Sequence, residues 1–181
     1  MKRVRALIAV IAAAMLSVGG WCAGPVPFAV ASTTKDLKDQ LAGAWTLVSI
    51  HNVRADGTKY ELFGPNAKGM LILNGSGHFS LHVTRAARPM FTSENRMTGT
   101  AEENRAAVQG MISLVGTFTV HEQDRSMLLR IESSSYPNLD GTEQRQSFRI
   151  IGDQLSWPEA APIAGPTGDL RSDLIWKRAR K

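Results

Sequence analysis

The four histidines of the chain, His51, His78, His82 and His121, are its first candidates for chemistry. His78 and His82 fall four residues apart on one face of a strand-like segment. They are separated by about 13 Å of strand, too far to bind one metal ion directly. The sequence also lacks a Ser-His-Asp motif in local context and a glycine-rich phosphate loop. We therefore predict no metal site, and His82 remains a candidate for the polar lining of a ligand site.

A carboxylate and a guanidinium on neighbouring segments form the second candidate group. The turn residues 138–141 join the segments 127–133 and 143–151, and a symmetric loop would place Glu132 opposite Arg145. On the outer face of a sheet such a pair is solvated and contributes well under about 1 kcal/mol. On the inner face of a barrel it would orient the polar head of a ligand. The sequence leaves both placements open.

Two loop segments add cationic and aromatic candidates. Residues 85–91 (RAARPMF) lie between a strand-like segment and a predicted helix. Long loops in compact barrels are often functional, so Arg88 and Phe91 are predicted to form a lid over the open end. Tyr136, before Pro137, is a second candidate for the rim. The alternative for both aromatic rings is ordinary packing against the core.

The N-terminus predicts export. Residues 1–5 are basic, and residues 6–19 form an uncharged apolar run too short to span a bilayer. The small residues at 29–31 (AVA) satisfy signal peptidase. We therefore predict a signal peptide over residues 1–31, a single mature domain over residues 32–181, and a periplasmic or secreted protein.

Cleavage at this position changes the cysteine content and the charge of the chain. It removes Cys22, the only cysteine, so the mature protein would have no disulfide. The alternative is a lipoprotein acylated at Cys22, which the preceding Trp21 disfavours because such cysteines follow small residues. Loss of Lys2, Arg3 and Arg5 lowers the formal net charge from +5 to +2. No Lys/Arg cluster then remains to indicate nucleic-acid binding.

The rest of the chain is a series of short strands and turns. A composition of 43% hydrophobic and 20% charged residues is that of one soluble globular domain. Runs rich in Val, Ile, Leu, Phe and Thr recur between Gly-, Asn- and Asp-rich turns, as in a sandwich or barrel. The predicted strands are 43–54, 59–63, 69–73, 78–84, 116–121, 127–133, 143–151, 154–157 and 172–178.

One hairpin and one helix can be predicted in more detail. If Gly75-Ser76 is a two-residue loop, Ile72 faces Phe79 and Met70 faces Leu81, which gathers four apolar side chains on one face. Residues 100–103 (TAEE) form a capping box, where a helix begins. An apolar stripe then predicts a helix of about 14 residues that ends near Gly116 and packs its apolar side on the sheet. The stripe consists of Val108, Met111, Ile112 and Val115.

The segment Gly43-Ala44-Trp45 at the start of the first strand would suit a closed sheet. Closure removes exposed edges, and eight strands enclose an interior just wide enough for side chains or one small ligand. Trp45 would close one end, and Gly43 would let the incoming chain lie against the indole ring. The alternative is that Trp45 is an ordinary core aromatic beside a chance glycine.

The order of the motifs resembles the bacterial lipocalin-like domain family, within the calycin group of β-barrels. The resemblance spans residues 41–177. The chain departs from it at Leu114-Val115, where members often have an aromatic pair, and at Leu129, where they often have a histidine, so no role of those groups is expected. The matching segments are 43–49 (GAWTLVS), 64–69 (GPNAKG), 88–91 (RPMF), 99–103 (GTAEE), 116–120 (GTFTV), 137–145 (PNLDGTEQR) and 174–176 (LIW).

The resemblance implies an all-β protein, an eight- to nine-stranded antiparallel barrel with one helix packed on or over it. We expect this barrel to bind a small hydrophobic or amphipathic molecule, with no cofactor, no nucleic-acid partner and no membrane span. Trp45 would close its base. Two alternatives stay open: an isomerase or cyclase with Glu132 as general acid or base, and a structural or partner-binding barrel filled by its own side chains. The candidates for polar lining or rim are His82, Arg88, Glu132, Tyr136 and Arg145.

Overall fold

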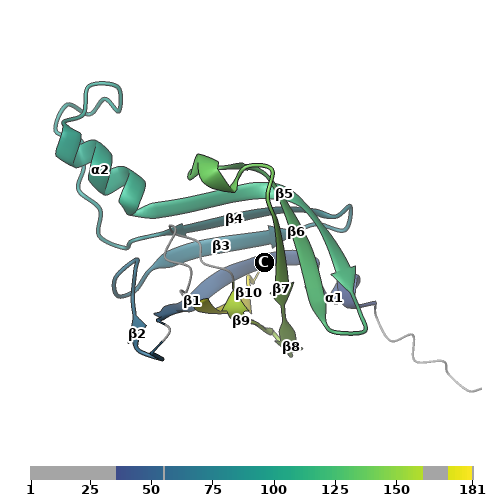
Figure 1. Cartoon of the computed structure of the whole chain (residues 1–181). Coiled ribbons are helices and arrows are strands. Elements are labelled where there is room, and N and C mark those ends of the chain that lie inside the picture. Colours follow the sequence, from purple (N-terminus) through teal and green to yellow (C-terminus); the bar gives the residue numbers. More distant parts are fainter. Residues whose placement is uncertain (1–35, 55, 161–170, 181) are drawn as a thin grey trace, which may run out of the picture. The chain divides into compact units, whose positions relative to one another are not determined.

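The structure is a computed structural model that describes residues 36–54, 56–160 and 171–180 (Figure 1). The predicted signal peptide and Cys22 lie outside the described residues. No helix within them is long and apolar enough to cross a membrane. Two α-helices, α1 (Leu37–Leu41) and α2 (Ala101–Gln109), and a 3-10 helix, η1 (Pro137–Leu139), accompany the sheet. The strands are β1 (Gly43–Val53), β2 (Lys59–Tyr60), β3 (Lys68–Leu73), β4 (His78–Thr84), β5 (Met111–His121), β6 (Ser126–Ser134), β7 (Glu143–Ser147), β8 (Arg149–Ile151), β9 (Gln154–Ala160) and β10 (Arg171–Arg178).

The strands form one antiparallel sheet in the order β7-β6-β5-β4-β3-β1-β10-β9-β8, with β2 paired to β1. The two strands that end this order, β7 and β8, are consecutive in the chain, and only Phe148 separates them. β7 pairs with β6 and β8 pairs with β9, so this stretch of chain joins the two ends of the sheet. The side-chain amide of Gln146 on β7 also donates to the carbonyl oxygen of Pro158 on β9, at 3.2 Å. The sheet is therefore a nearly closed barrel, which confirms the predicted fold class.

The buried apolar side chains of the core line the inside of this barrel. Side chains alternate between the two faces of each strand, so every second residue points inward. On β3 the inward residues Leu71 and Leu73 are fully buried, whereas their neighbours Met70 and Ile72 are about half exposed. The largest fully buried apolar side chains are Trp45, Trp176, Leu41, Leu71, Leu73, Leu81, Met127, Ile131, Leu155, Leu174 and Val83.

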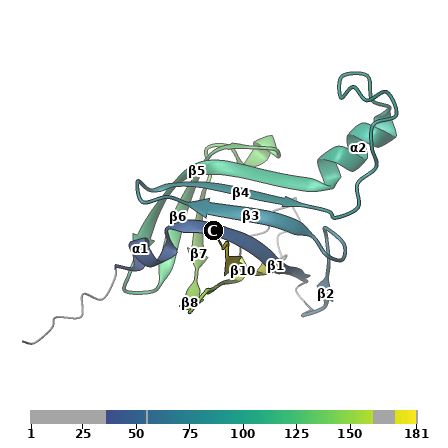
Figure 2. The same ribbon diagram turned by 180° about the vertical axis from the view of Figure 1, so that it is seen from behind.

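One end of the barrel, here called the base, is closed by α1 and Trp45. Asp36 caps α1 by accepting a hydrogen bond from the amide of Lys38 at 3.0 Å. Leu41, the last residue of α1, is fully buried, and its carbonyl oxygen accepts a hydrogen bond from Trp45 Nε1 at 2.9 Å. Figures 1 and 2 show α1 beside the turn between β5 and β6. Trp45 thus lies inside the barrel at the base, as the sequence predicted.

The β3–β4 hairpin has a different register from the one predicted. Met70 and Ile72 were expected inside, but they are 45% and 43% exposed. The loop has three residues instead of two: the amide of Asn74 donates to the carbonyl oxygen of His78 at 3.0 Å, and Gly77 has φ +92°. One extra loop residue moves every side chain of the strand to the opposite face. The observed inward pairs are Leu73 with Phe79 and Leu71 with Leu81.

The capping box of α2 is confirmed. The Thr100 hydroxyl accepts from the amide of Glu103 at 3.2 Å, and the Glu103 carboxylate accepts from the amide of Thr100 at 2.8 Å. The predicted length and packing of the helix are wrong. It ends at Gln109, it has no buried residue, and Val108 is 66% exposed.

The sequence after α2 forms a strand because its alternation outweighs its helical spacing. In Met111-Ile112-Ser113-Leu114, the second and fourth residues are buried and the other two are only partly buried. They pair with β4, where Ile112 lies opposite Val83. The inward residues of β5 thereby continue the core of β4, and the helix is confined to nine residues.

Candidate ligand site inside the barrel

The end of the barrel opposite the base, here called the mouth, carries buried polar side chains. β1 ends there and β10 begins there. Asn52 of β1 and Ser172 of β10 are buried, and Asn52 Nδ2 donates to Ser172 Oγ at 2.9 Å. The amide of Leu62 donates to Asn52 Oδ1 at 3.2 Å, which ties the β2–β3 connection to this pair. Buried Gln146 of β7 lies opposite Met127, close to the β5–β6 turn at the base. The apolar inner wall therefore has a few polar groups at the mouth and near the base.

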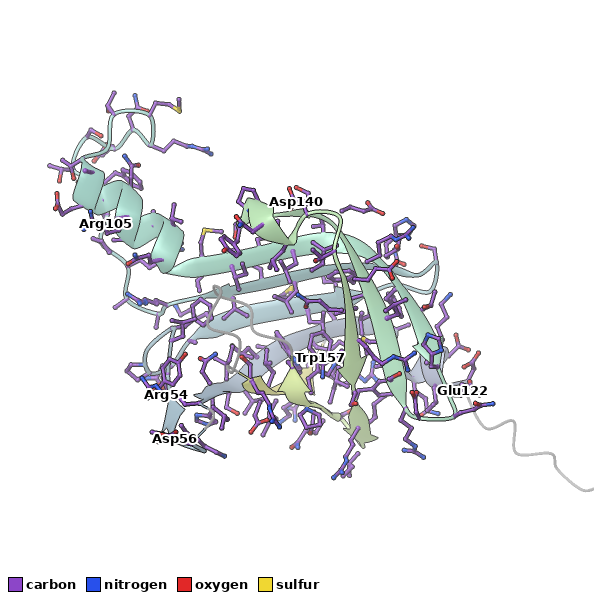
Figure 3. The ribbon with its side chains drawn as sticks, viewed as in Figure 1. Arg54, Asp56, Arg105, Glu122, Asp140 and Trp157 are labelled. Carbon is purple, nitrogen blue, oxygen red and sulfur yellow. The ribbon has the colours of Figure 1, made fainter. Side chains whose placement is uncertain are left out.

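Two buried indoles, Trp157 and Trp176, lie between these zones. Trp157 pairs with Leu174 and Trp176 with Leu155, so both rings share the inward face of β9 and β10. Figure 3 labels Trp157 on β9. The two ring centres are 5.9 Å apart with an interplanar angle of 67°, an edge-to-face arrangement that aromatic rings favour.

The nitrogens of these two indoles have no hydrogen-bond partner among the described residues. Trp157 Nε1 and Trp176 Nε1 are both closed to solvent. Trp45 Nε1, by contrast, is bonded to Leu41. An unpaired buried donor costs about 1–3 kcal/mol, and native structures pair most such groups. The inner wall thus holds two N–H donors whose natural complement is an acceptor oxygen.

The predicted site residues are dispersed and do not form one site. Trp45 is the only one of the six inside the barrel. Tyr136 is half buried beside η1 and packs against the core from the mouth. His82 is exposed on the outer face of β4, opposite Met70. Arg88 lies in the segment before α2 and is exposed.

The predicted pair of Glu132 and Arg145 does not form. Arg145 lies opposite Leu128, and Arg130 lies opposite Glu143, with which it makes an ion pair at 2.8 Å. Glu132 is exposed. The loop between the strands is not centred on residues 138–141. It contains η1, and the amide of Ile131 donates to the carbonyl oxygen of Thr142 at 3.0 Å, which moves the register away from the predicted one. The inward placement of Glu132 is therefore wrong.

Arg145 instead belongs to a polar group at the β5–β6 turn. Its Nη1 bonds to Asp124 and also lies 2.9 Å from Ser126 Oγ. The hydrogen bond from the Ser126 hydroxyl is the main cause of the lowered pKa of Asp124, and the charge of Arg145 adds to it. Together with His121, Arg145 and Asp124 line a surface pocket of about 490 Å³. Figure 3 shows the neighbouring Glu122 at this turn.

Three further residues were not recognised as site candidates from the sequence. In the sequence analysis Trp157 was only the last residue of the predicted strand 154–157, and Trp176 was only part of the matching segment 174–176. Arg85 lies near the mouth, where its Nη2 donates to the carbonyl oxygen of Leu62 at 3.1 Å, while its Nε is buried with no partner in the described chain. The alternation of Leu155 with Trp157 was the available signal for the inward face of β9. Within the described residues no group of three or more His, Cys, Asp or Glu side chains could hold a metal ion.

Comparison with known proteins identifies a relative whose name describes a carrier. The 4'-hydroxy-3'-methoxypropiophenone carrier protein ppsC of Aspergillus oryzae (strain ATCC 42149 / RIB 40) is 30% identical over 105 residues. The alignment covers 55% of this chain and 95% of the relative. The similarity therefore extends over nearly all of a protein named as a small-molecule carrier.

A family model gives wider coverage. The model of the lipocalin-like domain matches residues 42–179, which run from the residue before β1 to the residue after β10. The match covers every strand of the barrel, including Trp45, Trp157 and Trp176. The chain therefore belongs to the lipocalin-like domain family.

Proposed function

We propose that this protein is an exported carrier that holds a small hydrophobic or amphipathic molecule inside its barrel. Membership of the lipocalin-like domain family and similarity to a named carrier protein support ligand binding. The inner wall supplies a largely apolar surface with a few fixed polar groups, which is the usual character of a small-molecule site.

The observation that carries this proposal is the pair of buried indole donors that have no partner in the described part of the chain. Trp157 is 2% exposed and Trp176 is fully buried, so bulk solvent does not reach either nitrogen. A ligand oxygen that accepts from one of them recovers the cost of an unmade hydrogen bond, about 1–3 kcal/mol. Each such bond favours the loaded protein over the empty one by about fivefold or more.

The same geometry supports one class of ligand. Indole N–H groups donate and cannot accept, so the ligand must offer a carbonyl, ether, hydroxyl or carboxylate oxygen. The surrounding aromatic and aliphatic side chains favour an apolar or aromatic body. The compound in the name of the Aspergillus relative is an aromatic ketone with hydroxyl and methoxy groups, which supports an oxygen-bearing aromatic ligand for this chain as well.

Intrinsic fluorescence tests the proposal, because Trp45, Trp157 and Trp176 all lie inside the barrel. The exported protein is titrated with decanoate, a substituted benzoquinone and 4'-hydroxy-3'-methoxypropiophenone. We expect a saturable change in emission with at least one of them, and a dissociation constant about fivefold higher in Trp157→Phe, the loss of one hydrogen bond. Absence of saturable binding across all three chemical types would contradict a carrier role.

Export is the second part of the proposal. It is supported by the basic residues 1–5, the apolar run 6–19 and the small residues before Ser32. Mass spectrometry of the protein recovered outside the cytoplasm should give the mass of residues 32–181. A mass that includes Cys22 with attached acyl chains would identify a lipoprotein instead, and recovery of the uncleaved chain from the cytoplasm alone would contradict export.

A further inference from the structure

A cleft of about 590 Å³ lies between α2 and the segment that precedes it. Figures 1 and 2 show α2 and this segment beyond the ends of β4 and β5, away from the base of the barrel. Figure 3 labels Arg105 on the same helix. The cleft is about the size of a small-molecule site. Its lining includes Arg88, Met90, Phe91, Glu94 and Arg96 from the segment and Ala107 from α2.

Close contacts with two glycines hold the lining in place. A side chain at Gly99 would lie 2.4 Å from the Phe91 ring, so the ring rests directly on the backbone before α2. A side chain at Gly110 would lie 3.3 Å from Arg88 Cδ, so the aliphatic part of Arg88 lies over the backbone after α2. Because each glycine lacks a side chain, one lining side chain packs directly against the backbone at each end of the helix.

The Glu103 carboxylate links the segment to the helix between these two glycines. Its Oε1 accepts from both the amide and the hydroxyl of Thr92, each at 2.8 Å. Its other oxygen closes the capping box of α2. These hydrogen bonds lower the pKa of Glu103 to about 2. The carboxylate is therefore ionised at neutral pH and accepts all three hydrogen bonds there. The cleft is thus a built feature of the fold.

The charges of the cleft are unbalanced. Neither Arg88 nor Arg96 has a hydrogen-bond or ion-pair partner in the part of the chain that the structure describes. Glu94 is the one carboxylate in the lining. Its backbone φ of +53° lies in the left-handed region, which is unfavourable for a residue other than glycine. Two guanidinium groups against one carboxylate leave a net positive charge and planar donors suited to an anion.

The apolar part of the lining also lacks a partner. Met90 is 87% exposed, the highest value among the exposed large apolar side chains of the described chain, while Phe91 is half buried. A flexible thioether beside a fixed aromatic ring adapts to ligands of different shape. The cleft therefore presents apolar surface and cationic donors side by side.

We propose that this cleft is a second binding site, which takes a small anionic amphiphile: a carboxylate, or a similar anion, attached to an apolar body. Arg88 and Arg96 bind the anion, and Met90 and Phe91 cover the apolar part. The site is separate from the inner wall of the barrel, because none of its lining residues belongs to the buried core. It does not depend on whether the barrel carries a ligand.

Methyl NMR distinguishes the two sites in one experiment. The exported protein is labelled at methionine methyl groups and titrated with monomeric dodecanoate. Met90 reports the cleft, and Met127, which is fully buried inside the barrel, reports the interior. We expect a saturable shift of the Met90 methyl, whatever the response of Met127. A shift of Met127 alone would overturn the second site while leaving the carrier proposal intact.

Charge variants test the roles of the two arginines. Arg88→Gln and Arg96→Gln should each raise the dissociation constant read from Met90 by roughly two- to fivefold, as expected for exposed ion pairs. Glu94→Gln should lower it by about twofold, because it removes the opposing charge. Arg149→Gln, at an exposed site on β8, is the matched control and should leave it unchanged. Equal affinity in all four variants overturns the site.

A vesicle experiment separates a small-molecule site from a membrane contact. The protein is mixed with vesicles of phosphatidylglycerol and phosphatidylcholine in the absence of dodecanoate. Binding of dodecanoate that the two arginine variants weaken supports the proposal, with or without vesicle binding. Vesicle binding with no response of Met90 to monomeric dodecanoate overturns it, and so does the absence of any response.

Discussion

Arg178 stacks on Trp45 at the base of the barrel, with its guanidinium carbon 4.1 Å from the centre of the indole ring. The same guanidinium donates to the carbonyl oxygens of Ala42 at 3.1 Å and Gln40 at 2.7 Å. It thereby connects the end of β10 to the chain that enters β1. A side chain at Gly43 would lie 2.9 Å from Arg178 Nη1, so the glycine makes room for the arginine.

Arg178→Met should lower the free energy of unfolding by about 2–3 kcal/mol, because it removes the cation–π contact and two charged hydrogen bonds. Urea denaturation measures this, with exposed Arg149→Met as the control. Gly43→Ala should also destabilise the protein, since its φ of +140° disfavours a side chain. The cost of Gly43→Ala should be smaller in the Arg178→Met background, because the clash is gone. Strict additivity of the two substitutions would contradict this account.

The three indoles of the barrel should respond differently to loss of their N–H groups. Trp45→Phe removes a made hydrogen bond to Leu41 and should cost about 1 kcal/mol more than ring size alone explains. Trp157→Phe removes an N–H donor that has no partner among the described residues. Without ligand it should therefore lower the free energy of unfolding less than Trp45→Phe does. In the presence of ligand, Trp157→Phe should lose most of the ligand-induced rise in melting temperature. Equal losses for both variants in the ligand-free protein would show that Trp157 has a partner.

Gly116 should be among the positions least tolerant of a side chain. A Cβ there would lie 2.0 Å from the carbonyl oxygen of Arg130, at the point where the register between β5 and β6 shifts. The clash is with backbone, so the strand must move to relieve it. Gly116→Ala should therefore destabilise the protein by about 2–4 kcal/mol or prevent folding. Gly75→Ala, which meets nothing within 4 Å, is the control for thermal unfolding measurements.

Glu103 should give α2 a characteristic pH dependence. Its pKa in the folded protein is about 2, below the ordinary value of 4.5, because Thr92 and Thr100 donate to the ionised carboxylate. A lowered pKa means that the stabilisation is fully present above about pH 4.5 and is lost as the pH falls through about 2. Carbon NMR of the carboxyl group should show this low titration. Glu103→Gln should increase amide exchange at Thr92 while leaving the barrel amides unchanged, and titration near 4.5 would contradict the two contacts.

The fold class was predictable because it depends on local signals that agree with one another. Short β-rich runs, regular turns and the Gly43-to-Trp45 segment all indicated a barrel closed at one end. The capping box at Thr100 was equally local. Where two periodicities competed, at residues 108–115, the sequence favoured the longer helix, because only pairing with β4 shows that Ile112 and Leu114 belong to a strand.

The site was less predictable because it depends on register. A single extra residue in the 74–78 turn exchanged the faces of β3, and η1 displaced Glu132 from the position opposite Arg145. The important groups also have unremarkable sequence contexts. Trp157 is distinguished by the absence of a bonding partner among the described residues, and Arg178 by a contact with a residue more than 130 positions away. Neither feature is visible in the sequence.

The indole N–H resonances of residues 32–181 provide the most direct measurement of the central claim. The resonances of Trp157 and Trp176 are followed while apolar and aromatic oxygen-bearing compounds are added, with Trp45 as an internal reference because its N–H is already bonded. The carrier account predicts that a bound ligand shifts the Trp157 or Trp176 resonance downfield, as a new hydrogen bond forms, while Trp45 stays in place. Binding that leaves both resonances unmoved, or moves all three equally, would contradict it.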